Sequence, residues 1–486
     1  MSEIYQLSLC DLVENIKSKK ISCEEATKSY VDRAKKSKKL NCFIEETFQE
    51  AINKSKDQND KIDNNKKLFG APIAVKDLFC TKGIQTTASS KMLEGFKPEY
   101  ESTVTSKLWN EGANLLGKLN CDEYAMGSSN ETSYFGDVIN PYRNDKDLVP
   151  GGSSGGSASA VAANLTSATV GTDTGGSIRQ PASFTGTVGL KPTYGRCSRW
   201  GIVAFASSLD QAGPMTKDVK DASLMMEVIS GYDNKDSTSA QKKEEFFSQN
   251  LKQDIKGLKV GIPKEYKIAG MSQEIIDLWD KGIETVKSLG CEIKEISLPH
   301  TKYALPTYYI IAPAEASSNL ARYDGVKYGF RAEGKDLIEM YENTRSLGFG
   351  DEVKRRILIG TYVLSSGYYD AYYLKAQKVR RLIKNDFDEA FKTVDTILTP
   401  TTPSSAFAVG ENINDPISMY LNDVLTVPVN LAGLPAISIP AGYDKNNLPL
   451  GLQIIGKSFD EQTILNNAYA IEQTINFKPN VKDWWI

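Results

Sequence analysis

The stretch from Gly151 to Ser177 reads GGSSGGSASAVAANLTSATVGTDTGGS and contains two short motifs with the same local pattern. Each motif places a serine directly behind two glycines, and these serines are Ser153 and Ser177. Paired glycines let a backbone take unusual conformations and leave its N–H groups unshielded. An enzyme needs such N–H groups to stabilise an oxyanion. The two motifs therefore predict a pair of loops that carry catalytic chemistry.

The residues between the two motifs are mostly small and apolar. We expect a helix over Ala158–Ala163 and a strand over Leu165–Val170. A helix followed by a strand would return the chain to the same edge of a sheet, so the two serine loops would meet there. Ser177 is expected to open a further helix, whose N-terminal dipole favours developing negative charge.

Elsewhere the chain alternates between strand-like and helix-like segments. An apolar strand is expected over Ala71–Val75, and Lys76 follows it directly. Near the N-terminus, Ser22 and Glu25 have capping-box spacing, which predicts a helix start. Later segments predict strands over 258–262, 291–297, 394–399, 436–439 and 451–455 and an amphipathic helix over 272–289. Such alternation is typical of an α/β fold with a largely buried sheet.

The composition is that of an ordinary globular protein, with 40% hydrophobic and 24% charged residues. A formal net charge of −3 argues against a polycation built for nucleic acid. No apolar run approaches the roughly 18 residues needed to span a bilayer, so no membrane partner is expected. The 7 cysteines form no C-x-x-C pair and suit free thiols. We expect a cytoplasmic protein, or one of an organelle matrix if a transit peptide has been removed.

The sequence contains 1 histidine, His300. One histidine excludes a multi-histidine zinc site, and a Ser-His-Asp hydrolase would have to use it. It lies in a loop-like stretch after a strand-like run, so we expect a surface or packing role. Any serine chemistry then needs another base, and a neutral lysine is the usual substitute. A lysine pKa near 10.4 must be lowered by burial for that role, and Lys76 follows an apolar strand.

Two other interpretations of the glycine-rich loops are disfavoured. A phosphate-binding loop would need a lysine after its final glycine, and none follows here. A flexible linker would not lie between strongly apolar segments. From composition alone, a catalytic role and a structural role remain open.

The residues that carry a resemblance lie in five blocks. Residues 70–77, 151–157, 171–180, 189–196 and 207–211 are similar to the amidase signature family. The resemblance implies a large mixed central sheet covered by helices on both faces. It also implies that Lys76 is the base, Ser153 relays the proton and Ser177 attacks the amide. The backbone N–H groups of Thr174, Gly175 and Gly176 would line the oxyanion hole.

Three further blocks, 120–136, 315–325 and 365–373, resemble one branch of that family, the A subunits of glutamyl-tRNA(Gln) amidotransferases. The similarity runs from about residue 5 to 475. It implies a protein that hydrolyses glutamine and passes ammonia to a B subunit, which activates Glu-tRNA(Gln) with ATP and Mg²⁺. A small C subunit would brace the pair. This chain would itself hold no metal and no cofactor, and would form a single amidase domain over 1–486 with a signature core at about 70–215.

The same resemblance assigns Ser128, Tyr308, Arg356 and Asp423 to substrate binding. An arginine fork suits an α-carboxylate and an aspartate suits an α-ammonium. Arg355 is adjacent to Arg356, so either could be the carboxylate ligand.

The alternatives left open are a free-standing amidase acting on another carboxamide and a non-catalytic scaffold of the same fold. Asparagine as ammonia donor and tRNA(Asn) as acceptor also stay open.

Overall fold

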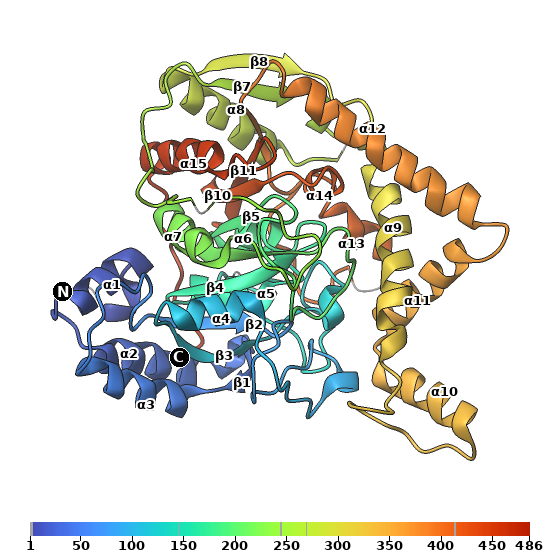
Figure 1. Ribbon diagram of the computed structural model, residues 1–486. Helices are drawn as coiled ribbons and strands as arrows, with labels where there is room; N and C mark the ends of the chain where they lie inside the picture. The colour runs from blue at the N-terminus through green and yellow to red at the C-terminus, as the bar shows by residue number, and fades with distance from the viewer. Residues whose placement is uncertain (1–2, 144, 244, 269, 413–414) are drawn as a thin grey trace.

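The computed structural model describes residues 3–143, 145–243, 245–268, 270–412 and 415–486 (Figure 1). Its centre is an 11-stranded sheet in the order β1-β3-β2-β4-β6-β5-β10-β11-β9-β7-β8. The strands are β1 (Phe43–Glu46), β2 (Pro72–Lys76), β3 (Asn114–Leu119), β4 (Ala168–Asp173), β5 (Val188–Lys191), β6 (Gln211–Thr216), β7 (Lys259–Pro263), β8 (Glu292–Ile296), β9 (Thr396–Pro400), β10 (Ala436–Tyr443) and β11 (Pro449–Gly456).

The sheet is mixed. Strand β2 runs parallel to both of its neighbours, β3 and β4. From β4 onwards the pairs β4–β6, β5–β6, β10–β5, β10–β11 and β11–β9 are antiparallel. Strands β7, β8 and β9 are parallel again. Every residue of β2, β4 and β9 is buried, as expected for strands that are covered on both faces.

Helices cover the two faces of this sheet. Successive residues of a strand point to opposite faces, and Leu452 and Gln453 of β11 show which helix lies on each. The Gln453 side chain accepts a hydrogen bond from Arg179 of α6 (Arg179–Thr185), whereas a Cβ at Gly282 of α8 (Gln273–Ser288) would meet Leu452. The helices are α1 (Leu9–Lys17), α2 (Cys23–Lys36), α3 (Phe48–Asn59), α4 (Thr103–Asn110), α5 (Gly155–Ala162), α6 (Arg179–Thr185), α7 (Val219–Ile229), α8 (Gln273–Ser288), α9 (Ala304–Asn319), α10 (Leu337–Gly348), α11 (Asp351–Leu364), α12 (Lys375–Ala390), α13 (Pro416–Leu421), α14 (Val427–Leu431) and α15 (Glu461–Ile475).

The predicted α/β fold with a mixed, two-sided sheet is confirmed. The capping box of Ser22 and Glu25 is present at the start of α2. Several boundaries were predicted wrongly: α5 begins at Gly155 and not at Ala158, and β10 extends to Tyr443 and not only to residue 439. Strand β4 begins at Ala168, because the chain turns after α5 before it joins the sheet. Helix α6 begins at Arg179, so Ser177 lies two residues before it.

Helices α9 to α12 gather on one side of the molecule, away from the two chain ends (Figure 1). Helices α9 and α11 pack closely, since a Cβ at Gly360 of α11 would collide with the Pro313 carbonyl group of α9. This contact needs glycine, and it fixes the position of α11 relative to the sheet. Among the described residues, no helix is both long and apolar enough to cross a membrane. The single-domain organisation stays a prediction.

Candidate active site

Lys76 is the last residue of β2, and its side chain is fully buried. The Nζ atom lies 2.7 Å from Ser153 Oγ, 3.0 Å from Ser154 Oγ and 3.0 Å from Thr172 Oγ1. Thr172 reaches the lysine because β4 lies beside β2 in the sheet. Three hydroxyl groups therefore surround one amine.

The hydrogen bonds of Ser154 indicate how that amine is oriented. The Ser154 hydroxyl donates to the Thr172 carbonyl oxygen at 3.1 Å, so it can only accept from Lys76. A neutral amine that donates to Ser154 and to Thr172 keeps its lone pair for the third neighbour, Ser153. Burial lowers the pKa of Lys76 to about 8, although nearby carboxylates oppose the shift. The geometry thus suits a lysine that takes a proton from Ser153.

The two serine motifs meet as the sequence predicts. The Ser154 backbone N–H donates to the Ser177 carbonyl oxygen at 3.2 Å. The peptide bond between Gly152 and Ser153 is cis. Ser177 retains 7% of its surface, whereas Lys76 and Ser153 retain none, so Ser177 is the member of the three that a small ligand can reach.

The turn before Ser177 needs its glycines. A Cβ at Gly175 would lie 2.8 Å from the Tyr308 ring, and one at Gly176, whose φ is +151°, would collide with the Thr426 hydroxyl. Among the described residues, the backbone N–H groups of Thr174, Gly175 and Gly176 have no hydrogen-bond acceptor. These groups are free to bind an anionic oxygen.

A buried polar network holds the turn that contains Ser177. Arg179 pairs with Asp173 through Nε at 3.0 Å and Nη2 at 3.1 Å, and neither side chain is exposed. The same guanidinium donates to Gln453 of β11 and to Asn430 of α14. Because Asp173 ends β4 and Arg179 begins α6, the pair clamps both ends of the turn that contains Ser177.

Asp423 and Tyr308 lie beside the same turn. A Cβ at Gly176 would come within 2.9 Å of Asp423 Oδ1. The Ser128 hydroxyl donates to Asp423 Oδ2, and Oδ1 has no partner among the described residues. Burial raises the pKa of Asp423 to about 7. An unpartnered, buried carboxylate oxygen next to Ser177 is suited to a cationic group of a ligand.

Arg356 of α11, and not Arg355, points inward. Arg356 is 3% exposed, whereas the Arg355 side chain is 46% exposed. The Arg356 guanidinium lies over the rings of Phe205, Tyr309 and Tyr420, at 5.3–5.7 Å from their centroids. Both arginines line the cavity described next, and Arg356 is the buried one of the two, so the assignment of Arg356 to substrate binding stays a prediction that its burial favours.

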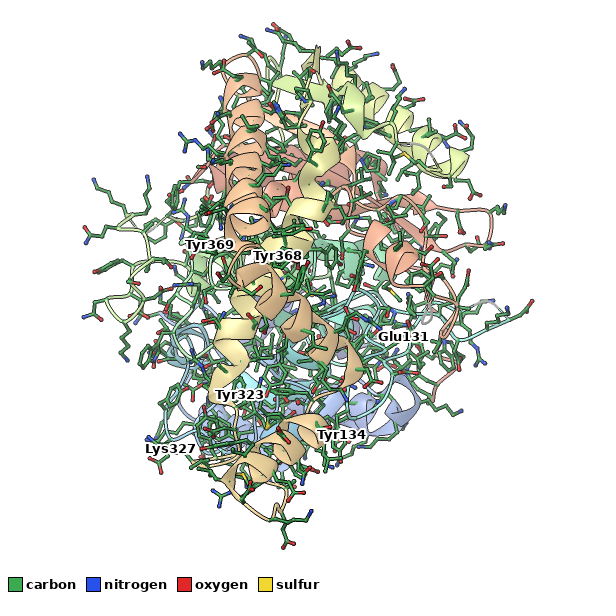
Figure 2. All side chains as sticks on the ribbon, turned by 90° about the vertical axis from the view of Figure 1, so that its right-hand side faces the viewer. Glu131, Tyr134, Tyr323, Lys327, Tyr368 and Tyr369 are labelled. Atoms are coloured by element: carbon green, nitrogen blue, oxygen red, sulfur yellow. The ribbon has the colours of Figure 1, made fainter. Side chains whose placement is uncertain are left out.

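A cavity of about 450 Å³ opens beside these residues. Its lining includes Ser128, Glu131, Glu352, Arg356 and Tyr420. Figure 2 looks onto this side of the molecule, with α11 in front and Glu131 labelled. Among the described residues, Ser128 connects the cavity to the candidate site, since it lines the cavity and its hydroxyl donates to Asp423, whereas Ser177 is not part of the lining.

The Amidase family model matches residues 25–465 of this chain. The chain belongs to the amidase family. This amidase is 71% identical over 486 residues to the A subunit of the glutamyl-tRNA(Gln) amidotransferase of Pelagibacter ubique (strain HTCC1062), with 100% of both chains covered. The crystal structure of the corresponding A subunit from Thermotoga maritima has a TM-score of 0.83 at 40% identity, covering 99% of each chain. The native peptide amidase of Stenotrophomonas maltophilia has a TM-score of 0.81 at 27% identity, covering 98% of this amidase and 99% of that chain.

Sequence reasoning missed several residues of the amidase site. Ser154 and Thr172 contact Lys76, Asp210 accepts a hydrogen bond from Thr174 Oγ1 at 2.7 Å, and Glu352 binds Arg356. The spacing of Glu352 and Arg356, four residues apart on a helix, is a signal that could have found the last pair. His300 binds Asp386 at 2.8 Å instead of any serine of the site. Among the described residues, no group of three or more His, Cys, Asp or Glu could hold a metal ion.

Proposed function

We propose that this amidase hydrolyses glutamine and supplies the ammonia for converting Glu-tRNA(Gln) to Gln-tRNA(Gln), as the A subunit of an ATP-dependent amidotransferase. The observation that carries the proposal is a pair of opposite buried charges, with Asp423 beside the turn of the candidate nucleophile and Arg356 in the wall of the adjoining cavity. Asp423 presents a free, buried oxygen and Arg356 a buried guanidinium. A free α-amino acid amide satisfies both charges, and a simple amide satisfies neither.

In the proposed acylation step, Ser177 Oγ attacks the side-chain carboxamide carbon of glutamine. The Ser177 proton passes to Ser153 Oγ while the Ser153 proton passes to Lys76 Nζ, which lies 2.7 Å away. The carbonyl oxygen gains the negative charge, and the free N–H groups of Thr174, Gly175 and Gly176 stabilise it. The C–N bond then breaks, a proton returns from Lys76 through Ser153 to the leaving nitrogen, and ammonia leaves.

In the deacylation step, a water molecule attacks the acyl ester on Ser177. Its proton follows the same route through Ser153 to Lys76, and the ester C–O bond breaks as that proton returns to Ser177 Oγ. The products are glutamate and free enzyme. The low pKa of Lys76 supports this cycle, since the amine must release its proton as readily as it accepts one.

Substrate orientation follows from the positions of the charged groups. Asp423, assisted by Ser128, would bind the α-ammonium, and Arg356 would bind the α-carboxylate. Tyr308 packs against Gly175 and would form the wall beside the scissile amide. Both recognition charges are buried, so each interaction would be strong and a substrate lacking either group would leave one charge unpaired.

The partners belong to the same proposal. We infer a B subunit that uses ATP and Mg²⁺ to activate Glu-tRNA(Gln), a C subunit that braces the complex, and a cytoplasmic location. No cofactor is assigned to this chain. The 71% identity to the A subunit of the Pelagibacter ubique amidotransferase, with complete coverage of both chains, supports this choice.

A free-standing amidase is the second candidate, and the likeness to a peptide amidase at 27% identity favours it. One assay separates the two. Ammonia release would be measured on glutamine, asparagine, propionamide and benzamide, with the chain alone and with B and C subunits, ATP and Glu-tRNA(Gln). We expect glutamine to be cleaved far better than the neutral amides and the rate to rise with the partners. Preference for a neutral amide, with no response to the partners, would establish the free-standing amidase.

A further inference from the structure

The guanidinium of Arg356 has a fixed carboxylate neighbour on its own helix. Glu352 lies four residues earlier on α11, so both side chains share one face of that helix. Glu352 Oε1 accepts a hydrogen bond from Arg356 Nε at 2.8 Å. The Glu352 side chain is 12% exposed and the Arg356 side chain 3%, so solvent screens the contact little.

The same carboxylate holds two further groups. The Tyr420 hydroxyl donates to Glu352 Oε1 at 3.0 Å, and Arg355 Nη1 donates to Oε2. Tyr420 stacks on Tyr309 with ring centroids 3.8 Å apart, and both rings lie against Arg356. Glu352 thus accepts hydrogen bonds from Arg355, Arg356 and Tyr420. The Arg356 guanidinium is hydrogen-bonded at Nε and packs against aromatic rings.

This arrangement leaves the terminal nitrogens of Arg356 unused. Among the described residues, Glu352 is the hydrogen-bond partner of this guanidinium, and the bond runs through Nε. The two terminal nitrogens form the fork that binds a carboxylate in a bidentate manner. The hydrogen bond at Nε and the three rings against the guanidinium restrict rotation about its last bonds, which narrows the range of directions in which the fork can point.

The side chains around Arg356 carry charges of both signs. Glu352 pairs with Arg355 and Arg356, and Glu123, Glu131 and Asp351 line the same cavity. Asp351 is exposed, pairs with Lys354 and does not contact Arg356. The free fork of Arg356, and not the net charge of the cluster, is what fits an incoming carboxylate.

We propose that Glu352 is a positioning residue for substrate recognition: it fixes Arg356 so that the guanidinium fork receives the α-carboxylate of the amino acid substrate. The inference rests on the proposed glutamine hydrolysis and deepens it. In this proposal Glu352 acts through Arg356 and makes no contact with the reacting atoms. Its contribution is to set the direction of the fork before the substrate arrives, which reduces the conformational freedom that binding has to remove.

The test compares steady-state ammonia release on two substrates, using the chain with its B and C subunits. Glutamine carries the α-carboxylate, and 4-aminobutanamide is the same molecule without it. For Glu352→Ala we expect the glutamine KM to rise tenfold or more, up to about 10²-fold, with kcat changed less than about twofold. The KM for 4-aminobutanamide should stay unchanged, which also shows that the variant is folded.

Two further variants distinguish positioning from charge alone. Glu352→Gln keeps an acceptor for Nε and for Tyr420, so its glutamine KM should rise less than that of Glu352→Ala. If Glu352 acted only through its negative charge, removing it would lower the glutamine KM, because the cluster would become more positive. Asp351→Asn is the matched control, since it removes a charge from the same turn without touching Arg356, and it should leave the glutamine KM unchanged.

The outcomes separate the two proposals. An unchanged or lowered glutamine KM in Glu352→Ala, together with a raised KM in Arg356→Ala, would overturn the role of Glu352 and leave glutamine hydrolysis standing. Failure of the wild-type complex to hydrolyse glutamine would overturn both. Equal losses on glutamine and 4-aminobutanamide would also overturn the positioning role, because a general structural effect does not distinguish substrates by their carboxylate.

Discussion

Lys76 Nζ lies 2.7 Å from Ser153 Oγ, with both residues fully buried at the end of β2 and in the loop before α5. The sequence around either residue does not predict this contact, because the two positions are 77 residues apart. The sheet creates it by placing β2 beside β4. The pair is the part of the proposed proton route that the geometry supports most directly.

Activity should therefore depend on the protonation of Lys76. Burial lowers its pKa to about 8, and the proposed base must be neutral, so kcat should rise with pH through about 8. Lys76→Ala should lower kcat by about 10²–10⁴-fold, since the chain has no nearby histidine to replace it. The measurement is kcat for glutamine between about pH 6 and about pH 10. A kcat that falls as pH rises through 8 would contradict a neutral lysine base.

Replacing Ser177 with Ala should abolish turnover, because it removes the proposed nucleophile from its place next to the free N–H groups of residues 174–176. Losses of a catalytic nucleophile reach several powers of ten, and we expect at least about 10³-fold. Mass spectrometry of the enzyme with slowly hydrolysed substrate should locate the acyl group on Ser177. Ser183→Ala, which removes a buried hydroxyl of α6 that contacts Thr402, is the control. An acyl group on another residue would show that the nucleophile is misassigned.

Asp423 should make the glutamine KM depend on pH. Burial raises its pKa to about 7, and only the charged form attracts the α-ammonium, so KM should fall as pH rises through about 7. Asp423→Asn should raise KM and remove that dependence. The kcat profile assigned to Lys76 should keep its position near pH 8, which separates the two groups experimentally. A KM that is flat in the wild-type enzyme would exclude this role for Asp423.

The Arg179–Asp173 pair should be costly to break. Both side chains are fully buried, so Arg179→Met would leave the Asp173 carboxylate without its charged partner. Breaking such a pair typically costs about 3–5 kcal/mol. Chemical denaturation would measure the loss. Lys392→Met, which removes an exposed pair with Glu389, should change stability by less than about 0.5 kcal/mol. Similar effects of the two substitutions would contradict a clamp at this turn.

The sequence predicted much of the fold because its signals are local. The strand before Lys76, the helix–strand succession of α8 and β8 and the two glycine-rich turns all follow from patterns within a few residues of one another. Strand order could not be predicted, since β10 joins β5 and β9 joins β7 through contacts across distant parts of the chain. The backbone N–H groups of residues 174–176 have no acceptor because of the conformation of the backbone there, and not because of particular side chains.

Only some residues of the candidate site could be predicted, again because only some of them lie in a local sequence pattern. Lys76, Ser153 and Ser177 lie in glycine-rich or apolar contexts that carry their own signal. Thr172 and Asp210 do not, because their partners are set by the neighbouring strands. Arg356 and Asp423 came only from family resemblance, and the burial of Arg356 depends on helices α9 and α11 packing together.

The proposed site draws its groups from almost the whole length of the chain, from Lys76 in β2 to Asp423 after α13. A ribosome releases the N-terminal part first, at about 5–20 residues per second. Between the emergence of Ser177 and that of Asp423 the nascent chain contains every residue of the proposed proton route but lacks the acid that would hold an amino group. An unfinished polypeptide therefore lacks both the Asp423 carboxylate and β11, whose Gln453 holds Arg179, and the proposed pocket is complete only when synthesis of the chain is close to its end.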